Sequence, residues 1–326
     1  MMSKRLAIGI DVGATNIKIT LGDEKGQILD KFSEKTEKNK DPESISNQLV
    51  KMIQSLQKGH LEAKTIVGIG IGSAGPLDLK KGGLMKPTNM PYDFVPLVEP
   101  LEDAFKLPTY LLNDCAVAVI GEKYFGAGKA QKNMAYITIS TGIGGGVYVD
   151  DHLLIGKDGN AHEIGHFTID NMGYLQCGCG KKGHWEAYCA GGSIPNFVRL
   201  LLEQKKPNEL ANSLLLKAVN KDLSKLTAKI LYDTAKTGDT LSVGLVEDIG
   251  RLNAIGFACV IDAYDPSLIT VGGAVALNNA DLVIAPIKRY VYDHARNRLP
   301  EIFLTPLGEY IVAHGALSMV FKHDDL

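Results

Sequence analysis

Residues 5–22, RLAIGIDVGATNIKITLG, contain two short apolar runs joined by a segment that is long enough only for a tight turn. The first run ends at Asp11, residues 17–22 have the composition of a second strand, and residues 27–34 can complete a three-stranded meander. A hairpin turn that contains glycine and a hydroxyl can bring backbone N–H groups close to a phosphate. A carboxylate at the end of a strand can hold Mg²⁺. The stretch is therefore either an ordinary hairpin or a phosphate-binding one.

Strands and helices alternate along the rest of the chain. Residues 41–58 have apolar positions at helical spacing, residues 66–72 form a buried strand before a Gly- and Pro-rich turn, and residues 108–114 form a strand directly before a helix. The pattern restarts with strands at 134–140 and 266–275, each of which runs into glycines. The alternation predicts a mostly parallel or mixed sheet covered by helices, and the restart predicts two lobes.

Composition excludes several classes of protein. The 326 residues carry 35 Lys and Arg against 37 Asp and Glu, a net charge of −2, with 45% hydrophobic residues. This balance excludes a strongly basic nucleic-acid binder and a highly charged disordered chain. The longest apolar runs are too short to span a bilayer, and no secretory signal is visible at the N-terminus. An odd number of cysteines, 5, argues against a secreted disulfide scaffold and predicts a reduced, cytoplasmic protein with a metal site.

Two further glycine turns follow apolar strands. Residues 140–146 read STGIGGG, and residues 271–274 read VGGA. The first matches neither the dinucleotide-binding nor the P-loop pattern, because it runs into the strand VYVD rather than into a helix. Each turn alone is weak evidence for a function, but three turns in this order predict close approach of the backbone to a nucleotide.

A polar pair, Asn113-Asp114, stands between the strand TYLL and an apparent helix. A carboxylate there lies near the C-terminal edge of a sheet, where α/β proteins usually bind ligands. Phosphoryl transfer to an alcohol needs a group that orients the hydroxyl and accepts its proton. From the residues alone, Asp114 is either that base or a helix N-cap.

A tract rich in histidine and cysteine follows. His162-Glu163-Ile164-Gly165-His166 spells the zinc-protease motif HExxH, which works only on a helix. Gly165 and the following FTID favour a strand over a helix, so a protease is not expected.

A better metal set consists of His166, Cys177, Cys179 and His184. Two thiolates and two imidazoles suit a closed tetrahedral Zn²⁺ site with no open position for catalysis. The alternatives are a solvated loop with two free thiols and a Cys177–Cys179 disulfide.

DVGATNIK, STGIGGG and ITVGGA together resemble the phosphate and adenosine elements of the sugar kinase/actin/Hsp70 superfamily, and the His–Cys tract is similar to that of the ROK family of sugar kinases. The resemblance runs over essentially the whole chain. It implies an α/β protein with two ribonuclease H-like lobes (the actin-like ATPase fold) and a small zinc-binding insertion, which close over ATP–Mg²⁺ and a hexose. The N-terminal lobe would comprise residues 1–116 with the C-terminal helix 310–326. The other lobe would comprise residues 117–309 with the zinc tract 160–190.

The resemblance also implies roles for individual residues. Asp114 is expected to be the catalytic base, and His184 stands where ROK kinases usually carry a third cysteine ligand. The residues expected to bind the sugar are Gly75, Asn89, Asn113, Asp114, Glu163, His166 and Glu186. Those expected to bind ATP and Mg²⁺ are Asp11, Gly13, Thr15, Asn16, Lys18, Thr141, Gly142, Gly144, Gly272 and Gly273. Zinc is expected at His166, Cys177, Cys179 and His184.

The activity implied is ATP-dependent phosphorylation of the 6-hydroxyl of a hexose. Ala187 after Glu186 favours N-acetylmannosamine, with glucokinase or broad hexokinase activity as the alternative. A sugar-sensing repressor would need a DNA-binding domain ahead of the first strand, and only about four residues precede it. An actin-type filament protein would need no sugar pocket. No nucleic acid or membrane partner is expected, and the family implies a homodimer or higher homo-oligomer.

Overall fold

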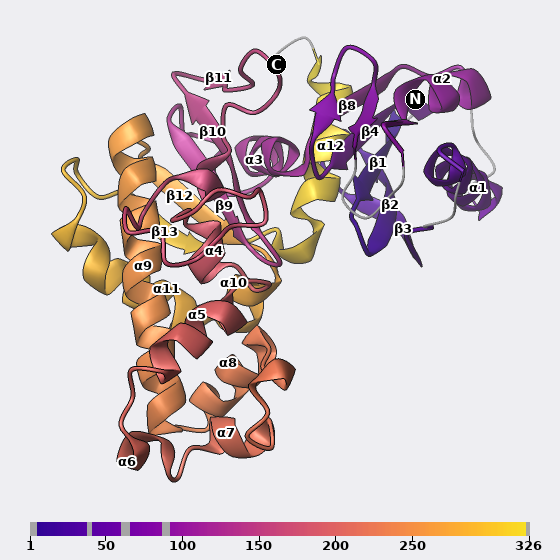
Figure 1. The fold of residues 1–326 in the computed structure, drawn as a ribbon. Coiled ribbons are helices and arrows are strands. Elements are labelled where there is room, and N and C mark those ends of the chain that lie inside the picture. Colours follow the sequence, from indigo (N-terminus) through magenta and orange to yellow (C-terminus); the bar gives the residue numbers. More distant parts are fainter. Residues whose placement is uncertain (1–4, 38–40, 60–65, 87–91, 324–326) are drawn as a thin grey trace. The chain divides into compact units, whose positions relative to one another are not determined.

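The computed structural model describes residues 5–37, 41–59, 66–86 and 92–323. The described part contains two five-stranded sheets and one small three-stranded sheet, with helices against them (Figure 1). This arrangement confirms the predicted α/β class.

The first sheet has the strand order β3-β2-β1-β4-β8. Its antiparallel half is the predicted meander, and β4 and β8 continue it in parallel to β1. The strands are β1 (Leu6–Val12), β2 (Asn16–Asp23), β3 (Ile28–Lys35), β4 (Ile66–Ser73) and β8 (Thr109–Asn113).

Alternate residues of the central strands face different helices. Ile8 and Ile10 belong to a buried cluster with apolar residues of α1 (Ser44–Gly59), such as Leu49. On the other face, a Cβ on Gly70 would come within 2.0 Å of the backbone oxygen of Ala316, in α12 (Ile311–Phe321). Glycines on this face therefore let α12 pack directly on the sheet, with α1 on the opposite side (Figure 1).

Three other elements complete this part of the chain. A small sheet has the order β5-β6-β7, and α2 and α3 flank β8 in the sequence. Their bounds are β5 (Leu77–Asp78), β6 (Gly83–Met85), β7 (Phe94–Pro96), α2 (Val98–Phe105) and α3 (Asp114–Tyr124). The small sheet was not anticipated from the sequence, because its strands are only two or three residues long.

The second sheet has the order β11-β10-β9-β12-β13. In both large sheets the third strand in chain order is followed across the sheet by the second, first, fourth and fifth, so the two halves repeat one topology. The strands are β9 (Met134–Ile139), β10 (Ile143–Val149), β11 (His152–Leu153), β12 (Leu268–Gly272) and β13 (Glu301–Leu304).

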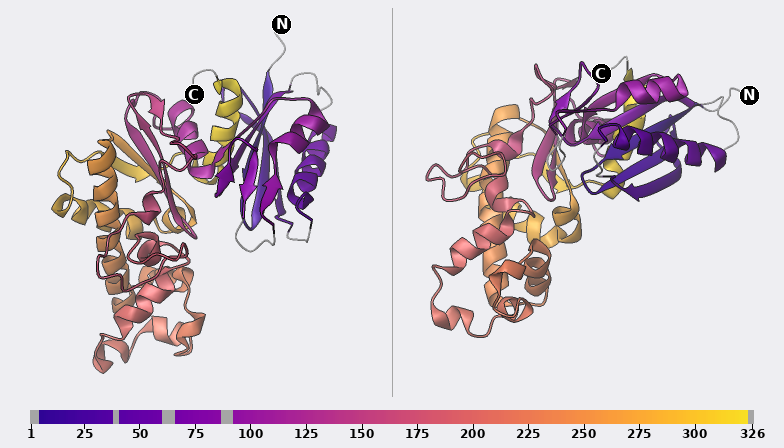
Figure 2. Two further views of the ribbon diagram at one scale, coloured as in Figure 1. Left: turned by 45° about the horizontal axis from the view of Figure 1, so that its top comes forward. Right: turned by 45° about the vertical axis from the view of Figure 1, so that its right-hand side comes forward.

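Helices make up about half of the chain between β11 and β13. The longest, α9, packs along α11, and both are visible in orange and yellow in Figures 1 and 2. The helices are α4 (Glu186–Cys189), α5 (Ile194–Leu202), α6 (Pro207–Leu210), α7 (Leu214–Ala218), α8 (Ala228–Lys236), α9 (Thr240–Tyr264), α10 (Ala274–Asn278) and α11 (Ala280–Tyr290). Short 3₁₀ turns are η2 (Ile164–His166), η3 (Leu223–Lys225), η4 (Val291–Asp293) and η5 (Gly308–Tyr310). Within the described residues, no helix is both long and apolar enough to cross a membrane.

Residues of the chain group into two compact units. Unit 1 comprises Met1–Lys132, Gly146–His162 and Thr305–Leu326, and unit 2 comprises Asn133–Gly145 and Glu163–Leu304. The lobe boundary near residue 116 stays a prediction.

Two local expectations are corrected. The strand expected at FTID, residues 167–170, is not formed: Gly165 lies in a 3₁₀ turn, Ile164–His166, and only an isolated bridge between Thr168 and His184 follows. The glycines 144–146 lie inside β10 rather than in a turn. A Cβ on Gly146 would come within 2.2 Å of the backbone oxygen of Cys115, so this glycine is needed for close packing.

Candidate functional site

Three parallel strands of the first sheet carry polar residues at or next to their C-terminal ends. In the register of β1, β4 and β8, Val12 pairs with Ser73 and Ser73 pairs with Asn113. Asp11 and Asp114 therefore lie at the C-terminal edge of one sheet, although 103 positions separate them in the chain. This is the edge at which α/β proteins usually bind ligands.

Helix α3 begins with a shared hydrogen bond. The backbone N–H of Cys115 donates to Asn113 Oδ1 at 2.9 Å and to Asp114 Oδ1 at 2.8 Å. Asn113 is thus the N-cap, so the capping and catalytic interpretations of Asp114 do not compete. The carboxylate of Asp114 therefore helps to cap α3 while it stands at the edge of the sheet, where a ligand hydroxyl could meet it.

The pKa values of both aspartates are raised. Burial and the neighbouring Asp114 carboxylate raise the pKa of Asp11 to about 7, and Lys18 acts in the opposite direction. Burial also raises the pKa of Asp114, against the effect of the hydrogen bonds from Cys115. Both residues are half-buried. Such a pair is stabilised in its charged form by a cation, and carboxylates are the ligands that Mg²⁺ prefers.

The turn between β1 and β2 is held by its own backbone. Gly13 N–H donates to the carbonyl oxygen of Asn16 at 3.1 Å, and the Thr36 hydroxyl donates to the carbonyl of Gly13 at 2.6 Å. Thr15 and Asn16 are exposed at this turn. Lys18 pairs in register with Asp11, and its Nζ lies 3.1 Å from Glu309 Oε2. Sequence reasoning did not identify Thr36 or Glu309, because both come from distant segments with no motif of their own.

The second glycine turn contacts a carboxylate. Ile143 N–H donates to Glu186 Oε2 at 2.9 Å, and a Cβ on Gly142 would lie 2.7 Å from the same oxygen. Thr141 is exposed, and its carbonyl accepts from Gly192 N–H at 3.0 Å. The turn and α4 therefore form one hydrogen-bonded assembly.

The third turn lies between β12 and α10. Gly273 has φ of +87°, a conformation that favours glycine. A Cβ on Gly272 would meet the hydroxyl of Tyr136 at 2.4 Å, so the backbone here packs closely on β9. Both glycines are in unit 2, as are Thr141, Gly142 and Gly144. Gly144 lies inside β10.

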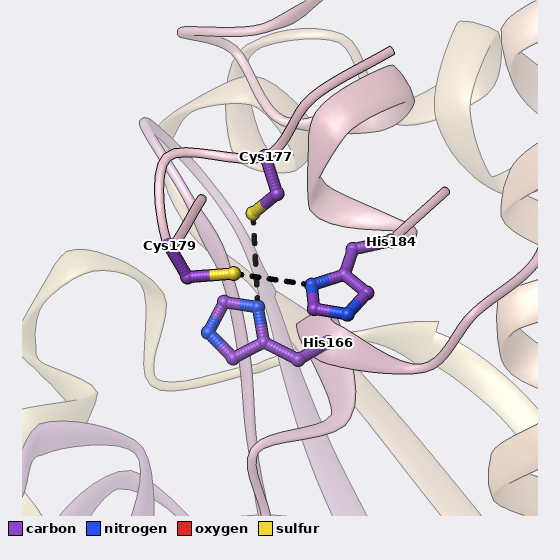
Figure 3. A group of neighbouring side chains, drawn as sticks. All are labelled: His166, Cys177, Cys179 and His184. Carbon is purple, nitrogen blue, oxygen red and sulfur yellow. Dashed lines mark hydrogen bonds between the residues drawn. The ribbon is translucent and has the colours of Figure 1, made fainter. Parts of the chain in front are cut away.

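The His–Cys tract brings four side chains together, as predicted (Figure 3). The ligand atoms of His166, Cys177, Cys179 and His184 all lie within 4.8 Å of one another. Cys177 Sγ is 3.7 Å from His166 Nδ1, and Cys179 Sγ is 3.3 Å from His184 Nδ1. All five cysteines are free thiols, so the alternative disulfide is not formed.

The donor chemistry of this cluster fits zinc. Burial raises the pKa of Cys177 to about 12, so the thiol holds its proton unless a cation replaces it. Burial and the neighbouring His166 lower the pKa of His184, which favours the neutral imidazole that metals bind. Two sulfurs and two ring nitrogens match a structural tetrahedral site.

Glu163 and Glu186 each contact a different residue of this cluster. Glu163 Oε2 lies 3.4 Å from His166 Nε2, while Nδ1 of the same ring faces Cys177. Glu186 Oε1 accepts from the Cys177 thiol at 3.5 Å. With His166 holding a metal through Nδ1, its Nε2–H would point to a carboxylate, an arrangement that fixes the ring.

Three remaining expectations have separate outcomes. His162 is buried, and burial lowers its pKa, but residues 162–166 form no α-helix, so the helical HExxH site is absent there. Gly75 is exposed, and a Cβ on it would lie 3.9 Å from Asn113 Nδ2. Asn89 lies outside the described residues.

The two large sheets share one strand order, and an aspartate pair lies at the edge of the first. This is the two-lobed, actin-like α/β fold. The His–Cys cluster with its four ligands is typical of ROK zinc sites. The chain belongs to the ROK family, whose model matches residues 7–323.

Individual relatives are similar over nearly their whole length. A glucokinase from Pyrobaculum calidifontis is 35% identical over 97% of this chain and 95% of its own. A solved ROK family glucokinase from Streptomyces griseus, in complex with glucose and AMPPNP, is 30% identical with a TM-score of 0.76, covering 96% of this chain and 98% of that one. A solved candidate N-acetylmannosamine kinase from Listeria monocytogenes has a TM-score of 0.75 over 98% of this chain and 99% of its own. It is only 19% identical, so it shows the fold alone.

Proposed function

We propose that this protein is an ATP-dependent hexose kinase that phosphorylates the 6-hydroxyl of glucose. The observation that carries the proposal is the Asp11–Asp114 pair at the C-terminal edge of the first sheet, with both pKa values raised. A general base works best when its pKa approaches the working pH, and burial moves a carboxylate in that direction.

Asp114 is proposed to accept the proton of the sugar hydroxyl through its carboxylate. As the bond between the hydroxyl oxygen and the γ-phosphorus forms, the bond from that phosphorus to the β–γ bridging oxygen breaks and ADP leaves. Asn113 caps α3 through Oδ1, and its Nδ2 group is proposed to donate a hydrogen bond to a sugar oxygen. Gly75 and Asn89 are proposed to contribute to the same sugar site.

Asp11 is proposed to hold Mg²⁺, directly or through water. Bound Mg²⁺ supplies positive charge to the phosphates as negative charge moves to the leaving oxygen. Lys18 adds a second cation near this carboxylate, since it lowers the pKa of Asp11. The turn residues Gly13, Thr15 and Asn16, and in unit 2 Thr141, Gly142, Gly144, Gly272 and Gly273, are proposed to bind ATP.

Glu163 and Glu186 are proposed to accept hydrogen bonds from the sugar hydroxyls. His166 is proposed to form a hydrogen bond with them as well. Carboxylates suit adjacent hydroxyl groups because they accept several hydrogen bonds at once. Zinc at His166, Cys177, Cys179 and His184 would fix the loops that carry them, without taking part in phosphoryl transfer.

Glucose is proposed as the substrate rather than N-acetylmannosamine. The prediction of N-acetylmannosamine rested on Ala187, a single small residue. Glucokinases from Pyrobaculum calidifontis, Halalkalibacterium halodurans and Aeropyrum pernix are 35%, 31% and 33% identical over most of the chain. The alternative from sequence, a glucokinase, therefore has the stronger support.

An ADP-release assay tests the proposal. With Mg²⁺ and ATP present, ADP formation should depend on glucose, and Asp114→Asn should lower kcat by about 10²–10⁴-fold while glucose still binds. The exposed Asp103→Asn, on α2, is the matched control. Near-normal turnover of Asp114→Asn would refute the role of this residue. Glucose binding without any sugar-dependent ADP release would instead indicate a sugar-sensing protein.

A further inference from the structure

The zinc tract is closed by a second set of contacts that contains no metal ligand. Tyr188, on α4, donates its phenol hydrogen to Asp170 Oδ2. The same phenol oxygen accepts from Leu175 N–H at 3.0 Å. Asp170 Oδ1 accepts from Met172 N–H at 2.9 Å, and Oδ2 accepts from Tyr174 N–H at 3.1 Å. We call the Tyr188–Asp170 pair with these backbone bonds the phenol clasp.

Ionisation fixes the direction of the central hydrogen bond. Burial and the bond to Asp170 raise the pKa of Tyr188 to about 12, so the phenol keeps its proton. Burial alone would raise the pKa of Asp170, but the hydrogen bonds from Tyr188, Tyr174 and Met172 outweigh it and hold this pKa below its usual range. A neutral donor thus meets a charged acceptor, which is the stronger kind of hydrogen bond.

The clasp belongs to the same short helix as Glu186. α4 is a single turn, Glu186–Cys189, so a shift of Tyr188 moves Glu186 with it. Glu186 in turn contacts the zinc ligand Cys177 at 3.5 Å and the backbone N–H of Ile143 at 2.9 Å.

A rigid neighbour holds the beginning of α4. The indole of Trp185 is fully buried, donates to Asn253 Oδ1 on α9 at 2.9 Å, and packs edge-on against Phe257. With one end of α4 fixed to α9, the orientation of the turn depends on what holds Tyr188.

We infer that Tyr188 is a positioning residue: through Asp170 it holds the zinc loop, residues 166–184, against α4 independently of the metal, and so sets the place of Glu186 for the sugar. Only the part of this inference that concerns sugar binding rests on the proposed kinase function. Metal and clasp close the same loop, so loss of either one should increase dependence on the other.

Tyr188→Phe tests this, because it removes one oxygen and leaves the ring in place. Zinc release to a chromophoric chelator should become about tenfold faster, and the KM for glucose should rise about tenfold, whereas the KM for ATP and the Tm change little. Added Zn²⁺ should restore the KM for glucose. Trp185 is the only tryptophan in the chain, so its fluorescence reports on α4 without reference to activity. Zinc removal should alter its emission more in Tyr188→Phe than in the natural protein.

Tyr290→Phe is the matched control, since Tyr290 also donates to a carboxylate, that of Glu247, but between α11 and α9. It should leave zinc release and the KM for glucose unchanged. Asp170→Asn is the second variant if Tyr188→Phe does not fold, and it should reproduce faster zinc release.

Zinc release and Trp185 emission within about twofold of the natural protein would overturn the inference. Absence of glucose-dependent ADP release in the natural protein would refute the proposed function, while the zinc and fluorescence measurements would still decide the role of Tyr188.

Discussion

Replacing Asp11 by asparagine is expected to stabilise the ligand-free protein. The pKa of this carboxylate is raised in the folded state from 3.8 to about 7 by burial and by Asp114. Between these two pH values the folded protein binds more protons than the unfolded chain, so the free energy of unfolding falls as pH rises. The full penalty is present above about pH 7, and asparagine removes it.

The size of the effect follows from the same pKa values. A rise from 3.8 to about 7 corresponds to about 4 kcal/mol, at about 1.36 kcal/mol for each pKa unit. Partial access to solvent and the coupled titration of Asp114 reduce this to about 2 kcal/mol. For a unit of this size, that gain raises Tm by roughly 4–8 °C.

Calorimetry without nucleotide, sugar or Mg²⁺ measures the gain. The increase in Tm for Asp11→Asn should be roughly two and a half to three times as large at about pH 8 as at about pH 5, since only part of the penalty is present at the lower pH. Asp103→Asn, an exposed change in the same unit, should show no such gain. An equal gain at both pH values, or a lower Tm at pH 8, would refute the reasoning.

Three other outcomes are expected. Cys177→Ser and His184→Ala should each lose zinc, measured by metal analysis, and raise the KM for glucose about tenfold; stoichiometric zinc in both variants would argue against the cluster. The kcat/KM for glucose should exceed that for N-acetylmannosamine by at least about tenfold in the ADP-release assay, and the reverse order would restore the prediction made from sequence. Asn253→Leu should lower the free energy of unfolding by about 1–3 kcal/mol, because the buried indole N–H of Trp185 loses its acceptor, and an unchanged Tm would contradict this.

Local patterns in the sequence predicted much of the fold and the metal cluster. The meander of β1–β3, the junction of β8 with α3, and the four zinc-ligand candidates all depend on residues close together in the chain. Apolar periodicity and the Cys177–Cys179 spacing are visible without tertiary information.

Contacts between distant segments could not be predicted in the same way. Trp185 and Asn253 are 68 residues apart, and Glu186 and Ile143 are 43 apart, so only the folded chain brings each pair together. The glycines 144–146 were misleading for a related reason. Glycine serves both turns and close packing, and the oxygen of Cys115 that requires Gly146 belongs to another element.

The shared strand order of the two large sheets has an evolutionary consequence. A hairpin opens each sheet, β1–β2 in one and β9–β10 in the other, and each hairpin turn carries candidate nucleotide residues. If both halves descend from one ancestral gene by duplication and fusion, these turns began as copies of one another. Asp11 stands near the end of β1, just before the first of these turns, whereas Thr141 and Gly142 lie in the turn between β9 and β10. On that account only the first copy keeps a carboxylate beside its turn, where it can hold a cation, and the second copy offers hydroxyl and backbone groups there.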